Sequence, residues 1–158
     1  MKTTEELIER LLQLFNEHKV KYVVIGALAL PAYGHIRTTE DIDIFIEPNE
    51  GNALKAIEAL KDFGYLAIED LTIKEFLSKK TLFRQYLLPT DIHPFVKGVN
   101  FEDLWENRVS FKIGSIYVYL PSLEDMIKMK KAAGRPKDLE DLKYLNKIKE
   151  LKKKKKSK

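Results

Sequence analysis

Two stretches, Tyr22-Val-Val-Ile-Gly-Ala27 and Asp41-Ile-Asp-Ile-Phe-Ile46, decide how this chain folds. The first is a short apolar run that ends at a glycine, which predicts a buried strand followed by a tight turn. In the second, side chains alternate between two faces of a strand expected over 41–47, so Asp41 and Asp43 share the face opposite the isoleucines. Their attachment points are about 6 to 7 Å apart along such a strand. Because two neighbouring carboxylates repel each other, the pattern favours a shared cation such as Mg²⁺ with substrate phosphates in its shell.

Length and composition predict one domain with oxygen-based metal chemistry. The chain has 158 residues, of which 44% are hydrophobic, and this is enough for a single core. No apolar run approaches the roughly 18 residues that cross a bilayer, and the start of the chain lacks a signal-peptide pattern, so we expect a cytoplasmic protein without membrane contact. The chain has no cysteine and three histidines. Disulfides and thiolate sites are therefore excluded, and Mg²⁺ or Mn²⁺ is favoured over zinc.

The net charge of +4 is concentrated at the end of the chain. Residues 147–158 contain eight lysines and one glutamate, a charge of +7, which leaves −3 for the residues before them. We expect one domain over 1–146, with a core at about 20–120 and C-terminal helices at about 122–148, followed by a basic, disordered tail over 149–158. The functional alternative for this Lys-rich tail is weak, salt-dependent contact with a nucleic acid.

Hydrophobic spacing and turn residues predict intermixed helices and strands. Helices are expected over 4–18, 27–33, 53–63, 73–79, 101–105, 122–131 and 139–148. Strands are expected over 20–25, 41–47, 65–68, 82–88, 91–96, 109–113 and 116–120, the last two joined by a tight Gly114-Ser115 turn. This order predicts an α/β (α+β) fold, with a mixed β-sheet flanked by helices.

The strand ending at Gly26, the short helix after it, the segment Arg37-x-Thr39-x-Asp41-Ile-Asp43 and the later strand residue Asp91 together resemble the DNA polymerase β-like nucleotidyltransferase superfamily. The resemblance covers roughly residues 20–96. Closest in size are the small stand-alone members, including those of toxin–antitoxin pairs. The resemblance implies a palm-like nucleotidyltransferase fold.

The same resemblance implies an activity and a set of catalytic residues. A nucleoside monophosphate would pass from a nucleoside triphosphate, with ATP as the first candidate, to a hydroxyl of an acceptor. Asp41, Asp43 and Asp91 would be the catalytic residues and would hold Mg²⁺ or Mn²⁺ in a two-metal arrangement. The structural alternative for Asp91 is that it is only a turn residue after Pro89-Thr90.

Nucleotide contacts are expected from six residues: Gly26, Ala27, Arg37, Thr39, Arg135 and Lys137. Glycine lets the backbone approach phosphates, and amides at the start of the following helix can donate to them. The superfamily has Gly or Ser where this chain has Ala27, so a hydroxyl contact is lost there. Arg37 can pair with phosphate oxygens or, structurally, with a neighbouring acid.

Several residues near this motif have ordinary structural interpretations. Asp138 is as readily a helix N-cap as a substrate contact. His35 and His93 are close in sequence to the proposed site, but a lone histidine is usually structural, so neither is assigned a role.

A core of this type leaves little chain for an acceptor pocket, which favours a macromolecular acceptor, protein or tRNA. The resemblance to toxin–antitoxin members implies that this acceptor could be a toxin partner. The competing hypothesis is a non-catalytic nucleotide- or RNA-binding module with a degenerate transferase site.

Overall fold

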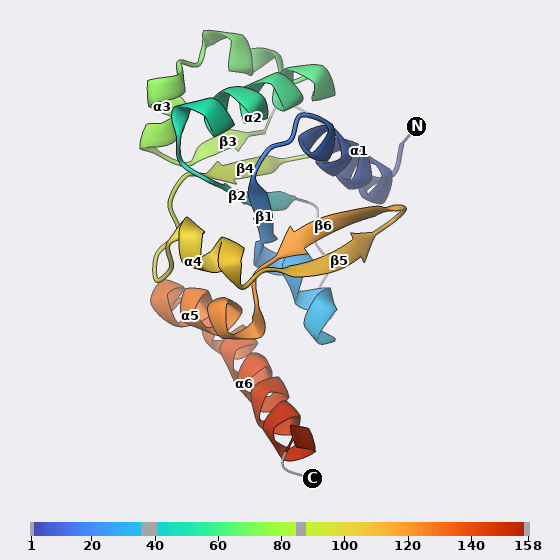
Figure 1. Ribbon diagram of the computed structural model, residues 1–158, viewed down its shortest axis with the longest axis vertical. Helices are drawn as coiled ribbons and strands as arrows, with labels where there is room; N and C mark the ends of the chain where they lie inside the picture. Colours follow the sequence, from blue (N-terminus) through green and yellow to red (C-terminus); the bar gives the residue numbers. More distant parts are fainter. Residues whose placement is uncertain (1, 36–40, 85–87, 157–158) are drawn as a thin grey trace.

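A computed structural model describes residues 2–35, 41–84 and 88–156 of the chain (Figure 1). Its main sheet has the strand order β1-β2-β4-β3. The two central strands, β2 (Ile42–Ile46) and β4 (Thr90–His93), run parallel, and the outer strands, β1 (Tyr22–Ile25) and β3 (Thr81–Phe83), run antiparallel to their neighbours. The predicted mixed sheet flanked by helices is therefore confirmed.

One side of this sheet is covered by α1 (Thr4–Glu17) and α2 (Glu50–Phe63), with α3 (Ile73–Ser78) beside them (Figure 1). The hydroxyl of Thr3 caps α1 by accepting from the Glu6 amide at 3.1 Å. Asn49 caps α2 in the same way, which makes α2 start earlier than the apolar spacing predicts. The three isoleucines of β2 are fully buried, as their alternation predicts.

The opposite side carries α4 (Phe101–Glu106) and α5 (Leu123–Ala133) (Figure 1). A hairpin of β5 (Val109–Ile113) and β6 (Ile116–Leu120) lies beside the edge strand β1, and its turn is hydrogen-bonded to Glu9 of α1. The hairpin forms at the predicted turn but makes a separate two-stranded sheet. Phe45, on the same face of β2 as Asp43, packs edge-on against Phe101 with ring centroids 5.2 Å apart. Both faces of β2 are therefore covered, and the acids lie at the end where this cover stops.

Two short segments form 3₁₀ structure, which agrees with the short helix expected over 27–33 and differs from the strand expected over 65–68. Residues 27–33 fall in a 3₁₀ helix, η1 (Gly26–Tyr33), and the expected strand at 65–68 is instead a 3₁₀ turn, η2 (Leu66–Asp70). Tyr65, just before η2, stacks on Phe83 with centroids 4.8 Å apart and shares a hydrogen bond with Thr90 at 2.7 Å. Side-chain packing, and not strand pairing, therefore holds this segment in place.

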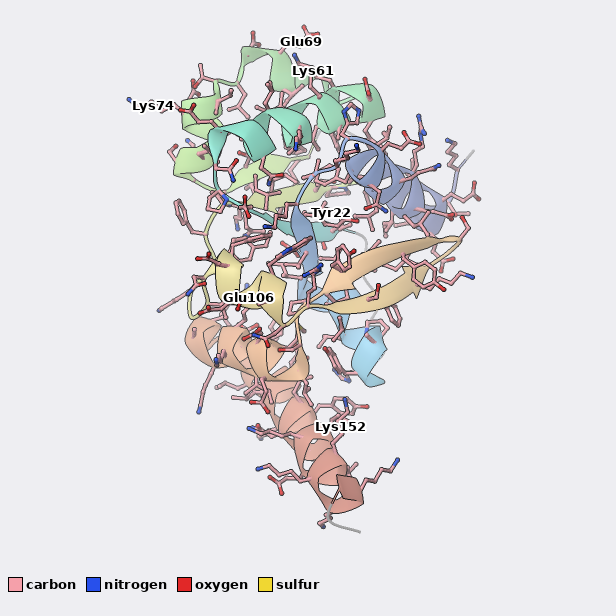
Figure 2. All side chains as sticks on the ribbon, in the orientation of Figure 1. Tyr22, Lys61, Glu69, Lys74, Glu106 and Lys152 are labelled. Carbon is pink, nitrogen blue, oxygen red and sulfur yellow. The ribbon has the colours of Figure 1, made fainter. Side chains whose placement is uncertain are left out.

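The last helix, α6 (Pro136–Lys156), extends away from the rest of the molecule (Figure 1). The expectation of a disordered tail from residue 149 is therefore corrected as far as Lys156. Lysine is a good helix former, and no glycine or proline interrupts the run. Lys149 pairs with Glu124 at 3.2 Å, and Lys152, labelled in Figure 2, lies 5.5 Å from the ring centroid of Tyr33. Over the described ranges, no helix combines the length and apolar character that crossing a bilayer requires.

Candidate active site

The acidic residues of the two central strands meet because of the strand register. In the parallel pairing of β2 and β4, Asp43 lies opposite Asp91 and Phe45 lies opposite His93. Asp43, Asp91 and His93 each offer one ligand atom, and these three atoms all lie within 4.8 Å of one another. Two carboxylates and an imidazole thus converge on one small volume.

His93 is the nearest partner of Asp43, with its Nε2 atom 2.8 Å from Asp43 Oδ1. Its side chain is largely buried, with 17% exposed. The sequence analysis assigned this histidine no role, although its position two residues after Asp91 puts both side chains on one face of a strand. The missing information was the register of β2 against β4, which the sequence does not display.

The local charges keep Asp43 ionised. Burial acts to raise the pKa of Asp43, but the hydrogen bond and charge of His93, a hydrogen bond shared with Asp91 and the charge of Lys80 outweigh it. The pKa of Asp43 therefore lies below its usual value. An ionised carboxylate is the form that a metal ion binds.

Asp91 is buried and forms an ion pair with an arginine that no sequence pattern singles out. Arg84, just after β3, donates from Nη1 to Asp91 Oδ1. The pKa of Arg84 is raised, first by this hydrogen bond and then, against the opposing effect of burial, by the charges of Asp91, Asp41 and Asp43. Arg84 thus lies in the combined field of all three predicted acids. No sequence pattern identifies it, because the contact depends on how β3 ends beside β4.

Asp41 lies directly before β2 and contributes to this field, but it is not among the three residues whose ligand atoms lie within 4.8 Å. The structure therefore groups Asp43 with Asp91 and His93 across the two strands. Arg37 and Thr39, the predicted phosphate ligands, lie outside the described residues.

Gly26 lies directly against Asp43. Its φ of +73° is in the left-handed region, and a Cβ atom added there would lie 2.7 Å from Asp43 Oδ2. Ile25 is the register partner of Asp43 across the β1–β2 pair, so the turn begins beside the carboxylate. Ala27 follows within η1. The missing Cβ atom lets the Asp43 carboxylate lie directly against the bend. A phosphate bound at the start of the following helix would therefore lie next to a metal ion held by Asp43.

A cleft of about 240 Å³ runs from Gly26 and Asp43 to α5 and the α5–α6 turn. Its wall is mostly apolar and includes Phe95, Met126 and Met129. Among the predicted nucleotide ligands, Arg135 lines this cleft, whereas the exposed Lys137 does not. The pKa of Arg135 is raised, first by its hydrogen bond to Asp138 and then, against burial, by the charges of Asp138 and Asp43.

Asp138 has a structural part in this end of the cleft. It is the third residue of α6, and its carboxylate accepts from the backbone amide of Arg135 at 3.2 Å and from the Arg135 Nε atom at 2.6 Å. Asp138 is therefore not the N-cap residue. It is the third residue of the helix, and its side chain accepts a hydrogen bond from the backbone amide of the N-cap residue, Arg135, as in a capping box. Lys130 of α5 contacts Asp138 at 3.4 Å and Asp141 at 3.1 Å, so the two helices are joined through buried charges.

The donor set fits a divalent metal ion. Asp43, Asp91 and His93 supply oxygen and nitrogen donors on two neighbouring strands, and Gly26, Asp43 and His93 line the cleft. Carboxylates are the ligands that Mg²⁺ and Mn²⁺ prefer, and imidazole suits transition metals. The arrangement can thus hold a cation together with a phosphate-bearing substrate, which is the requirement of a nucleotidyltransferase.

Comparison with known proteins identifies the same class. Residues 2–154 match the family described as "Nucleotidyltransferase of unknown function (DUF6036)". The chain belongs to this nucleotidyltransferase family. No curated protein sequence matches it.

Two solved structures share the fold. The first is the lincosamide antibiotic adenylyltransferase LnuA, solved with lincomycin bound, at 20% identity and a TM-score of 0.61, with 94% of this chain and 99% of that chain covered. The second is an antigenic nucleotidyltransferase-like protein from Paracoccidioides brasiliensis, at 16% identity and a TM-score of 0.50, with 90% and 74% covered. At these identities the likeness concerns the fold. The predicted class, a nucleotidyltransferase, is confirmed by the family match.

Proposed function

We propose that this protein transfers a nucleoside monophosphate from a nucleoside triphosphate, with ATP as the first candidate, to a hydroxyl of an acceptor, and that it requires Mg²⁺ or Mn²⁺. The observation that carries the proposal is the convergence of Asp43, Asp91 and His93 within 4.8 Å next to the left-handed turn at Gly26. Family membership supports nucleotidyl transfer in general.

The residues have distinct roles in this proposal. Asp41, Asp43 and Asp91 would hold the metal ions, which supply charge neutralisation on the triphosphate and the leaving group. Gly26 and Ala27 would bring backbone amides to the phosphates. Four further residues would bind the nucleotide through their side chains: Arg37, Thr39, Arg135 and Lys137. Arg135 is supported best among these, because it lines the cleft and lies in the field of Asp43.

The acceptor is the less constrained part of the proposal. The fold neighbour LnuA, which this chain covers to 99%, is by its name an adenylyltransferase of an antibiotic, so a chain of this size does not require a macromolecular acceptor. The apolar cleft beside Asp43 has a volume of about 240 Å³, just below the range of about 300–1,000 Å³ that is usual for small-molecule sites. This observation favours a small hydroxylated acceptor as the second candidate.

A macromolecular acceptor, protein or tRNA, is supported by α6. This helix extends from the cleft end of the molecule and carries most of the lysines of residues 147–158 (Figure 1). An exposed cationic helix attracts an acidic protein surface or RNA. A toxin partner encoded beside this gene would be one such acceptor.

The test is labelling with two forms of ATP. The protein is incubated with cell extract, or with the product of a neighbouring gene, in the presence of Mg²⁺ or Mn²⁺ and ATP labelled at either the α- or the γ-phosphate. Nucleotidyl transfer predicts that a protein, RNA or small-molecule fraction takes up the α label and not the γ label. Electrophoresis and thin-layer chromatography separate the three acceptor classes.

Asp91→Asn should abolish the α-labelled product, because it removes one metal ligand while keeping the side-chain size. The matched control is Asp62→Asn, since Asp62 also pairs with a histidine, His18, at 2.6 Å, but on the surface. Uptake of γ label would indicate a kinase. Metal-dependent ATP binding without any transferred label would favour the non-catalytic binding module.

A further inference from the structure

We propose that His93 is a direct metal ligand and that its imidazole makes the site prefer Mn²⁺ over Mg²⁺. The inference deepens the proposed function and rests on the same metal site. It adds a ligand that the Asp-x-Asp pattern does not contain.

The spacing of the donor atoms suits coordination. In an octahedral shell with bonds of about 2.1 Å, adjacent ligand atoms are about 3.0 Å apart and opposite ones about 4.2 Å apart. His93 Nε2 is hydrogen-bonded to Asp43 Oδ1 at 2.8 Å, which is close to the spacing of adjacent ligands. A metal ion would take the place of the shared proton, which is released to solvent when the ion binds. The Asp91 carboxylate lies within 4.8 Å of both atoms, so small side-chain rotations bring all three onto one ion.

The position of His93 also holds it in place. It is on the central strand β4, two residues after Asp91, and its backbone pairs with Phe45 of β2. Its side chain is 17% exposed, so few other rotamers remain open to it. A ligand placed on a strand in this way loses little conformational entropy when it binds a metal ion.

Other His–Asp pairs in the described residues show what sets this one apart. His18 contacts Asp62 at 2.6 Å, and both side chains are substantially exposed. His35 contacts Asp141 at 3.3 Å and stacks on Tyr144 with ring centroids 4.4 Å apart. His93 is the histidine that also has a second carboxylate, that of Asp91, within reach of a shared ion.

The chemistry of the donor set gives the expected preference. Mg²⁺ takes oxygen ligands almost throughout and keeps much of its water shell. An imidazole nitrogen adds affinity for divalent transition metals and adds little for Mg²⁺. A site of two carboxylates and one histidine should therefore bind Mn²⁺ more tightly than Mg²⁺.

The primary test is pulsed electron paramagnetic resonance of the full chain loaded with Mn²⁺ alone, without nucleotide. Direct coordination predicts spin-echo modulation from an imidazole ¹⁴N nucleus. Bound Mn²⁺ that shows no nitrogen modulation would overturn the inference. This measurement needs no variant and therefore does not depend on how a substitution affects folding.

The second test compares Mn²⁺ and Mg²⁺ affinities by calorimetry. His93→Asn should weaken Mn²⁺ binding at least about tenfold, since losing even an outer-shell partner costs about 10–100-fold, and should change Mg²⁺ binding much less. His18→Asn is the matched control and should change neither affinity. An unaltered ratio of the two affinities in His93→Asn would contradict the inference.

Asp43→Asn separates this inference from the proposed function. If Asp43→Asn abolishes Mn²⁺ binding while His93→Asn leaves the affinity ratio unchanged, the metal site stands and the role of His93 fails. If Asp43→Asn binds Mn²⁺ like the unmodified chain, the metal site of the proposed function fails as well.

Discussion

Gly26 and Asp43 show at the residue scale how backbone conformation and chemistry are linked in this site. The left-handed φ of Gly26 turns the chain beside Asp43, and the missing side chain leaves room for the carboxylate. Any other residue would introduce a Cβ atom 2.7 Å from Asp43 Oδ2. The glycine is therefore required both for the turn and for the position of the acid.

Gly26→Ala should accordingly impair function as well as stability. The backbone strain alone should cost about 1–2 kcal/mol of the free energy of unfolding. Displacement of Asp43 should in addition weaken metal-dependent ATP binding, measured by calorimetry, by at least about tenfold, a loss of about 1.4 kcal/mol.

Gly134→Ala is the matched control for this prediction. Its φ of +63° imposes similar backbone strain, but the nearest atom to an added Cβ is Lys131 O at 3.8 Å. Gly134→Ala should lose stability without losing ATP binding. Equal effects of the two substitutions on ATP binding would show that the contact with Asp43 is unimportant.

The residue scale is also where sequence analysis reached its limit. Asp43, Asp91 and Gly26 were predicted because their residue types and their positions at strand ends are visible locally. His93 and Arg84 were missed because their contacts depend on the registers of β2, β3 and β4. Only the folded sheet places them, since a shift by one residue would move each to the opposite face.

At the element scale, the α5–α6 joint forms one wall of the cleft. Lys130, with 12% of its side chain exposed, lies between the buried carboxylates of Asp138 and Asp141. Removing one partner from a buried charge pair is costly because the other charge stays buried. Substitutions that remove one partner from this joint should therefore be strongly destabilising.

Asp138→Asn should lower the free energy of unfolding at neutral pH by about 1.5–3 kcal/mol, the usual value of hydrogen bonds to a charged group. Burial alone would raise the pKa of Asp138, but the hydrogen bond from Arg135 and the charge of Lys130 outweigh it and lower that pKa. The stabilisation is thus complete above the unfolded-state pKa of about 3.9. It is lost as the pH falls through the lower pKa of the folded state.

Denaturant unfolding at several pH values checks this prediction. The stability difference between the unmodified chain and Asp138→Asn should be constant near neutrality and should shrink below about pH 4. A difference that grows on acidification would contradict the assigned direction of the pKa shift.

Most helices and strands were predictable from local signals, such as the Thr3 and Asn49 caps and the Gly64 end of α2. The exceptions are η2, where the packing of Tyr65 replaces strand pairing, and the end of α6, where a lysine run that suggests disorder continues the helix. Strand order was not predictable, because neither the β2–β4 pairing nor the separate hairpin sheet has a local signature.

At the scale of the whole molecule, the acid-bearing end of the sheet, the cleft and the cationic α6 are parts of one small chain. Deleting residues 151–158 removes six lysines. We expect this deletion to abolish association with single-stranded RNA and to leave ATP binding unchanged. Fluorescence anisotropy over a salt series should show a slope of log affinity against log salt of about −0.7 per phosphate contacted in the full chain. RNA affinity that survives the deletion would place the nucleic-acid contact elsewhere.

The central claim is that carboxylates on two neighbouring strands hold a cation that carries the triphosphate. Calorimetric titration of ATP, with and without Mg²⁺ or Mn²⁺, tests it most directly in the unmodified chain and in Asp43→Asn, with Asp62→Asn as the control. We predict ATP binding that requires the divalent ion, is abolished by Asp43→Asn and is unchanged in Asp62→Asn. ATP binding that is independent of metal, or equally strong in Asp43→Asn, would contradict the account.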